Sequence, residues 1–151
     1  MYKIKKFEDR YNESVNNFII SILVDEYGFE EYRDELEQQN NLEYIENGGD
    51  LWIALDENED IVGTIALVKH SDEEAELKKL YVRKDYRGKG LSKELYRVVM
   101  ETTKNKAYNR IFLGTYEKLE TAIKFYIKRG FKHIDGLDEE ENGARYFELY
   151  V

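Results

Sequence analysis

The 151-residue sequence contains no cysteine and no proline. Without cysteine the chain forms neither a disulfide nor a thiolate metal site, and it has no thiol nucleophile. It also lacks a prolonged apolar run, and its first residues, Met1 to Phe7, lack the apolar core of a signal peptide. We therefore expect one cytoplasmic domain over residues 1–151, without a membrane partner. A chain of this length can bury about 70% of its unfolded surface.

Basic residues are outnumbered by acidic ones. The 23 lysines and arginines stand against 32 aspartates and glutamates, which gives a formal net charge of −9. Because nucleic-acid phosphates are bound by basic surfaces, this charge argues against DNA or RNA as a partner. An acidic surface would attract a cationic substrate such as an amine. It also serves to keep a protein soluble, and charge alone favours that simpler interpretation.

Familiar metal and nucleophile motifs are missing too. The segment Asp138 to Gly143 begins like a calcium loop, but Leu149 stands at the twelfth position, where such a loop has glutamate. The acidic turn at 56–60 lacks the required glycine. His70 and His133 are too isolated to predict a zinc site. No G-x-S-x-G elbow and no P-loop occur, so we expect no metal ion.

The segment from residue 76 to 99 carries the strongest local pattern. It begins as a strand, Glu76 to Val82, and ends in a helical pattern of leucines and valines. Between them lies a glycine turn whose backbone can approach a ligand closely. The free N–H groups of the helix start suit an anion. The predicted phosphate-binding residues are Arg87, Gly88, Lys89, Gly90, Leu91, Ser92 and Lys93.

The rest of the chain alternates between strand and helix patterns. We expect strands near residues 2–7, 51–55, 61–68, 76–82, 110–115, 131–134 and 145–151, and helices near 13–26, 30–46, 91–99 and 119–127. The three strands from 51 to 82 form an antiparallel meander. The strand, helix and strand that follow form a crossover, which makes those two strands parallel neighbours. A mixed sheet flanked by helices results.

Three blocks of this sequence resemble the GNAT N-acetyltransferase superfamily. The loop R-x-x-G-x-S at 87–92 is similar to the family's R/Q-x-x-G-x-G/A pyrophosphate loop, with the small Ser92 in place of Gly or Ala. The stretch 113–131 matches the family's A-I-x-[LF]-Y-x-x-x-G-F pattern, and Ile61-Val-Gly-Thr64 resembles its I-V-G turn. The resemblance covers most of the chain. It implies an α/β (α+β) fold with a mostly antiparallel sheet of about seven strands, a parallel pair at the cofactor site, and about four helices.

The resemblance also implies a chemistry. Members of the family transfer acetyl from acetyl-CoA to an amine, here a primary amine of a small molecule or peptide. Backbone N–H groups of Leu80, Tyr81 and Val82 would hold the thioester and the pantetheine arm, in a slot where two parallel strands splay. The pyrophosphate would lie on the loop from 87 to 92, with Arg87 as its charged flank. A homodimer is possible as well.

Two catalytic residues follow from the same resemblance. Tyr126 matches the tyrosine that protonates the leaving sulfur, since a phenol is a donor with an ordinary pKa near 10. From its spacing alone it would be a packing residue. Glu76 matches the carboxylate base of the histone-acetylating branch, although it could equally be an exposed strand residue. Leu119 departs from the asparagine that many members have near this position.

Two further alternatives stay open. The region 29–46, rich in carboxylates, should wall the acceptor pocket in this family, and a solvated helix face explains most of those charges as well. The same fold also serves non-catalytic modules that bind acyl-CoA as sensors or structural domains. A third hypothesis is an unrelated nucleotide-binding domain, which would bind ATP or NAD in place of CoA.

Overall fold

The strand β3 (Ile61–Lys69) is apolar along nearly its whole length, and the computed structural model, which describes all 151 residues, buries it on both faces. A strand covered on both faces has a continuous apolar run in place of strict alternation. Its neighbours β2 (Asp50–Leu55) and β4 (Glu74–Val82) pair with it antiparallel, which confirms the predicted meander.

Seven strands form one sheet in the order β1-β2-β3-β4-β5-β7-β6. The remaining strands are β1 (Lys3–Lys6), β5 (Arg110–Tyr116), β6 (Lys132–His133) and β7 (Ala144–Tyr150). Only the β4–β5 pair is parallel. The mixed, mostly antiparallel sheet with one parallel pair is thus confirmed.

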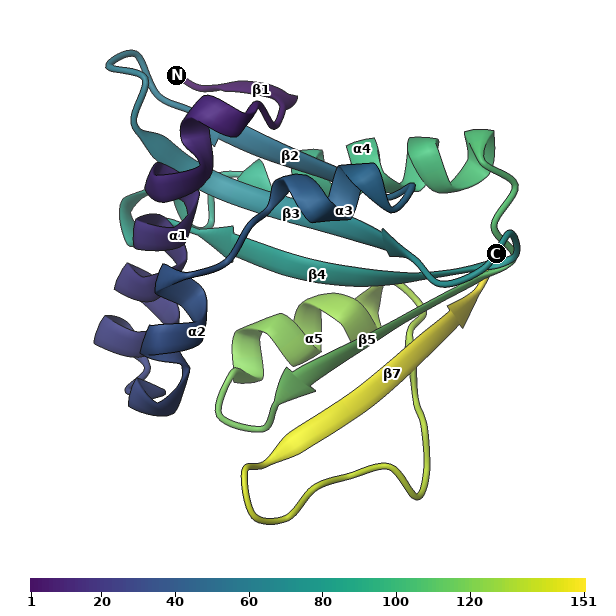
Figure 1. Cartoon of the computed structure of the whole chain (residues 1–151). Coiled ribbons are helices and arrows are strands. Elements are labelled where there is room, and N and C mark those ends of the chain that lie inside the picture. Colours follow the sequence, from purple (N-terminus) through teal and green to yellow (C-terminus); the bar gives the residue numbers. More distant parts are fainter.

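Helices cover both faces of this sheet (Figure 1). On the face toward the viewer lie α1 (Asn12–Ile20), which continues as a π-helical segment (Ser21–Glu26), then α2 (Arg33–Glu37) and α3 (Leu42–Glu46). On the other face lie α4 (Leu91–Asn105) and α5 (Glu120–Lys128). Each face has its own apolar core. None of the helices combines the length and the apolar character that crossing a membrane requires.

The glycine of the I-V-G turn lets α4 approach the sheet. A Cβ on Gly63 would lie 3.1 Å from the side chains of both Leu91 and Leu95, which is tighter than ordinary packing. Leu91, Leu95 and Val99 are at most 1% exposed. Gly63 therefore fixes the start of α4, and with it the preceding glycine loop, close to the centre of the sheet.

The predicted helix over 30–46 is interrupted, and this accounts for five α-helices where about four were expected. Between α2 and α3 the chain is tied to α1 by asparagine side chains. Asn41 Nδ2 donates to Asn12 Oδ1 at 2.8 Å and to Asn16 Oδ1 at 2.7 Å, and Asn16 Nδ2 donates to the Gln39 carbonyl at 2.9 Å. These bonds between distant segments hold the chain in a turn at the place where a helix would otherwise continue.

Candidate functional site

The parallel strands β4 and β5 pair along only part of their length. Their register covers the three pairs Glu74–Arg110, Ala75–Ile111 and Glu76–Phe112. Beyond these pairs the two strands diverge toward their C-terminal ends (Figure 1), while β5 stays paired with β7 along its full length. The C-terminal half of β4 therefore has an open edge, which is the splay that the resemblance implied.

Backbone N–H groups of β4 point into this opening. Arg83 donates its N–H to the Val62 carbonyl on β3 at 2.9 Å. Because successive residues of a strand direct their N–H groups to opposite edges, the N–H groups of Val82 and Leu80 face the side away from β3. They are donors without a strand partner, and an extended ligand can use them as a further strand would.

A cleft of about 400 Å³ runs along this open edge. Eight of the predicted cofactor residues line it, namely Leu80, Tyr81, Val82, Arg87, Gly88, Gly90, Ser92 and Lys93. The other lining residues are Ile22, Tyr27, Leu119, Thr121, Ala122 and Phe125. Two predicted residues lie outside the cleft wall: Lys89 is exposed, and the side chain of Leu91 is buried in the core beneath the loop.

The glycine loop has the geometry of an anion cradle. Gly88 and Gly90 have φ values of 73° and 92°, in the left-handed region that favours glycine. A Cβ at either position would have nothing within 4 Å, so both face open space. Gly90 is also the N-cap of α4, and no side chain caps this helix start. The first N–H groups of α4 are therefore free for a ligand, at the positive end of the helix dipole.

Arg87 has a different partner from the one expected. Its guanidinium donates to both carboxylate oxygens of Glu26, at 2.5 and 2.8 Å, and its Nε donates to the Val82 carbonyl at 2.8 Å. The hydrogen bond to Arg87 holds the pKa of the Glu26 carboxyl below its usual value. The structure thus ties the loop to the π-helical segment through Arg87, which also lines the cleft, and Lys89 and Lys93 add further positive charge at the loop.

Tyr126 lies in the apolar core beside the cleft and is not one of the residues that line it. It is 6% exposed and packs edge-on against Phe125 and Phe131. Burial raises the pKa of its phenol well above the ordinary value, and the phenols of Tyr81 and Tyr96 add to this effect. Tyr81 and Phe125 line the cleft, whereas Tyr126 lies just behind them. The hydroxyl therefore stays protonated near neutral pH, as a proton donor must.

Glu76 lies where the strands begin to separate. It faces Phe112 in the last parallel pair, and its carboxylate is bound to His70 Nε2 at 2.9 Å. The side chain is 21% exposed. Its charge contributes to the raised pKa of Tyr44 on α3, which places Glu76 on the α3 face of the sheet. It lies outside the cleft, on the face of the sheet that α3 covers.

The face of the sheet beneath α2 and α3 is lined by tyrosines, while the carboxylates of the region 29–46 face solvent. Its seven acidic residues, Glu30, Glu31, Asp34, Glu35, Glu37, Glu43 and Glu46, are all exposed. In contrast Tyr32, Tyr44, Tyr81 and Tyr116 are partly buried on this side. The solvated-face interpretation of the acidic stretch is the one that fits. The aromatic lining was missed, because its members come from four separate elements.

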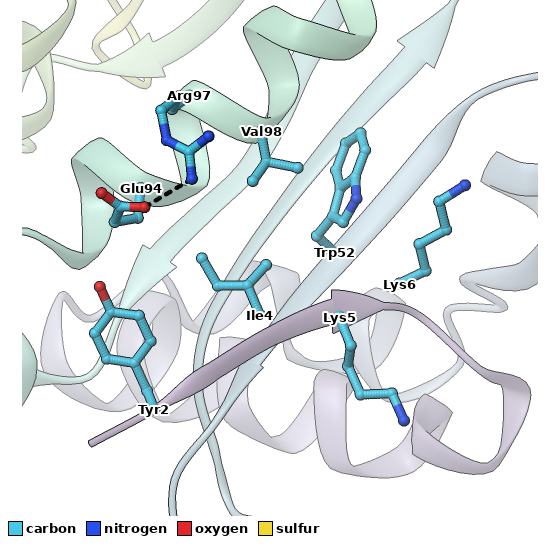
Figure 2. A pocket seen from close by; sticks show the side chains of 8 residues that line it. All are labelled: Tyr2, Ile4, Lys5, Lys6, Trp52, Glu94, Arg97 and Val98. Atoms are coloured by element: carbon cyan, nitrogen blue, oxygen red, sulfur yellow. Dashed lines mark hydrogen bonds and ion pairs between the residues drawn. The ribbon is translucent and has the colours of Figure 1, made fainter.

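A second hollow lies beside β1 and the outer side of α4 (Figure 2). It measures about 500 Å³, and Tyr2, Ile4 and Trp52 contribute to its wall. Its arginine, Arg97, is paired with Glu94 at 3.0 Å. None of its lining residues belongs to the glycine loop or to the open edge of β4. The chemistry predicted from the sequence therefore belongs to the first cleft.

Comparison with known proteins gives consistent results. The model of the acetyltransferase (GNAT) family matches residues 16–131. An uncharacterized N-acetyltransferase of Mycobacterium tuberculosis is 36% identical over 91 residues, which are 60% of this chain and 58% of that protein. The match therefore spans less than two thirds of that curated relative.

Solved structures match over the whole chain. A GNAT-family acetyltransferase from Staphylococcus aureus is 30% identical, with a TM-score of 0.90 over 99% of both chains. The PaiA N-acetyltransferase of Thermoplasma acidophilum, solved in complex with coenzyme A, has a TM-score of 0.80 at 20% identity and covers 100% of this chain and 99% of that one. At that identity the second likeness concerns the fold alone.

Proposed function

Because this chain belongs to the GNAT acetyltransferase family, we propose that it transfers an acetyl group from acetyl-CoA to a primary amine of a small molecule or peptide. One observation carries the proposal. The unpaired edge of β4 and the glycine loop at the start of α4 line a single cleft. An extended arm with a pyrophosphate at one end needs this combination of strand-edge donors and anion cradle.

The residues present fit that co-substrate. The pyrophosphate would accept hydrogen bonds from the free N–H groups of the α4 start, with Lys89 and Lys93 adding positive charge. The N–H groups of Leu80 and Val82 would hold the pantetheine arm and polarise the thioester carbonyl. Arg87, bound to Glu26, would keep the loop in position. Leu119 lines the cleft at the place where many family members have asparagine, so its contact would be apolar.

The transfer removes two protons from the acceptor ammonium and supplies one to the leaving sulfur. Glu76 would take a proton from the acceptor ammonium, directly or through water, which frees the nitrogen lone pair. The nitrogen then bonds to the carbonyl carbon while the carbon–sulfur bond breaks, and the proton that the nitrogen loses in becoming an amide would replace the one that Tyr126 gives up. Tyr126 would give its proton to the leaving sulfur, and its raised pKa ensures that it carries that proton at neutral pH.

Release of free thiol from acetyl-CoA across a panel of primary amines tests this function. We expect thiol release that depends on both the protein and an amine. Binding of CoA without release for any amine in the panel would favour the non-catalytic acyl-CoA-binding module. Protection against unfolding by ATP or NAD, with none by CoA, would point to a nucleotide-binding domain.

A further inference from the structure

The strand β4 carries a backbone irregularity directly before the cleft. Thr64 pairs with Tyr81 and Ala66 with Lys78, so two residues of β4, Lys79 and Leu80, lie opposite the single residue between them on β3. Lys79 has a φ of 60°, and it is the only non-glycine residue inside a strand with φ in the left-handed region. The buried Thr64 hydroxyl donates to the Lys79 carbonyl at 2.6 Å. Such bulges re-aim a side chain, and they are frequent beside functional sites.

The bulge leaves Lys79 partly buried without an ionic partner. Burial, with the neighbouring Lys78 ammonium, lowers the pKa of Lys79 to about 8, and the carboxylate of Glu35 on α2 opposes this shift. No hydrogen bond or ion pair contributes to it. Other partly buried cations of this chain, such as Arg87 and Arg110, are paired with carboxylates. Burying a cation without a partner is costly, so an anion that reaches Lys79 would be bound favourably.

Lys79 lies on the acceptor face of the sheet, among the tyrosines. Glu35 influences the pKa of both Lys79 and Tyr44, which places Lys79 on the side covered by α2 and α3. Tyr81, two residues further along β4, lines the cleft. The Tyr116 hydroxyl donates to that of Tyr32 at 2.7 Å, so β5 is joined to the α2 region here. Lys79 therefore belongs to the strand that borders the cleft, and it lies on the face of that strand that carries the tyrosines.

From this arrangement we propose that Lys79 binds an anionic group of the acceptor, so that the acceptor is an amine that also carries a carboxylate, such as an amino acid. The inference rests on the proposed acetyl transfer. Glu76 lies three residues earlier on β4, which corresponds to roughly 10 Å of strand. Two long side chains at that spacing can reach the two ends of one small zwitterion, with Glu76 at the ammonium and Lys79 at the carboxylate.

This assignment differs from two other roles for the same lysine. As a general base Lys79 would act on every amine, with or without a carboxylate. As a packing residue it would affect folding and leave the choice of acceptor unchanged. An anion anchor alone discriminates between two acceptors that differ only in their charge.

The test compares each common amino acid with its amide, in which an uncharged carboxamide replaces the carboxylate. For the amino acid that the wild-type protein acetylates best, we expect kcat/KM for the acid to exceed kcat/KM for its amide by about ten- to a hundredfold. This is the range of one hydrogen bond between charged groups. Lys79→Met should remove most of that preference, chiefly by raising KM for the acid. Lys79→Arg should restore part of it. Lys78→Met, the same change at an exposed neighbour, should retain the wild-type preference.

Several results would overturn the proposal. A wild-type protein that acetylates acids and amides equally has no anion anchor. Equal losses on both members of a pair in Lys79→Met would make the lysine a general base. In either case the acetyl transfer itself stands, so the two failures are distinguishable. Preference for acids that persists in Lys79→Met would assign the anchor to another residue.

A binding measurement covers the case in which no member of the panel is turned over. Calorimetry on the CoA-loaded protein should show tighter binding of the acid than of its amide, and this difference should disappear in Lys79→Met. Equal binding of the two would overturn the proposal. The melting temperature of Lys79→Met should be no lower than that of the wild type, because the substitution removes a charge that burial disfavours.

Discussion

At the scale of single residues, the proposed chemistry depends on groups whose surroundings set their protonation. Tyr126 and Glu76 are both acidic side chains, but they lie in opposite environments. Tyr126 is buried among aromatic rings, and its pKa is raised. Glu76 is partly exposed and bound to His70. Two groups held apart in this way can serve as proton donor and proton acceptor in one reaction.

Tyr126→Phe should lower kcat by roughly 10²–10⁴-fold, the usual contribution of a general acid. CoA affinity should change little, because the substitution removes only a hydroxyl that lies behind the cleft wall. Steady-state kinetics and calorimetry measure the two quantities. Tyr108→Phe is the matched control, since Tyr108 is a buried tyrosine of the same core. An unchanged kcat with chemistry rate-limiting would make Tyr126 a packing residue.

Glu76→Gln should lower kcat/KM at neutral pH, and kcat/KM of the variant should recover partly as the pH rises. Most of a primary amine is protonated near pH 7, so a base is needed there, whereas free amine accumulates in solution at higher pH. Glutamine keeps the size of the side chain and can still bond to His70. A pH–rate profile is the measurement, and Glu73→Gln in the exposed turn before β4 is the control. A wild-type profile in Glu76→Gln would assign the base to water or to another carboxylate.

At the scale of elements, the glycine loop acts as a unit with the start of α4. Gly63 allows α4 to pack close to β3, and Arg87 ties the loop to the π-helical segment. The free N–H groups of the helix start are therefore held beside the open edge of β4. The two parts of the cleft are positioned by packing around them, and neither part has to move to meet the other.

Gly90→Val should weaken CoA binding by about tenfold or more, which is about 1.4 kcal/mol. The new side chain would stand in the open space that the pyrophosphate is expected to occupy, and it would strain a residue with φ of 92°. Calorimetry with CoA is the measurement. Gly136→Val is a matched control, because Gly136 has φ of 85° and equally open surroundings on a loop away from the cleft. Equal affinities of the two variants would disprove the cradle.

At the scale of the whole molecule, the splayed strands leave one side of the sheet incomplete. β4 and β5 share three residue pairs, while β5 and β7 share seven. The half of the sheet built on β5 is therefore joined to the rest mainly through the base of the opening and the helix α5. A ligand that fills the opening contacts both halves, and it should stabilise the native state against unfolding.

CoA at a concentration one hundred times its Kd should raise the free energy of unfolding by about 2.7 kcal/mol. For a chain of this length that corresponds to a rise of roughly 5–10 °C in Tm. Thermal unfolding with increasing CoA is the measurement, with adenosine as the control that lacks both pyrophosphate and pantetheine. A Tm that does not depend on CoA concentration would contradict the proposal that this protein binds CoA.

The sequence by itself determined the elements and the loop. Apolar periodicity placed β2 to β5, α5 and the start of α4 within a few residues, because burial of one face imposes its own spacing on each segment, whereas α4 continues past the predicted end at 99 to Asn105. The glycines at 88 and 90 indicated a tight turn, since both have φ in the left-handed region. The strand–helix–strand order fixed the parallel pair, because a crossover of this kind connects parallel neighbours.

Only the tertiary structure decided which distant residues meet. Arg87 pairs with Glu26, which is 61 residues away, and the break between α2 and α3 depends on asparagines of α1. Ile22 and Tyr27 line the cleft because the end of the first helix docks beside β4. The partial burial of Lys79 arises at a bulge between β3 and β4, and the tyrosine wall arises because four elements are brought together. The sequence pattern of a segment indicates which face of that segment is buried. Contacts between residues that are distant in the sequence depend on how the segments pack on one another.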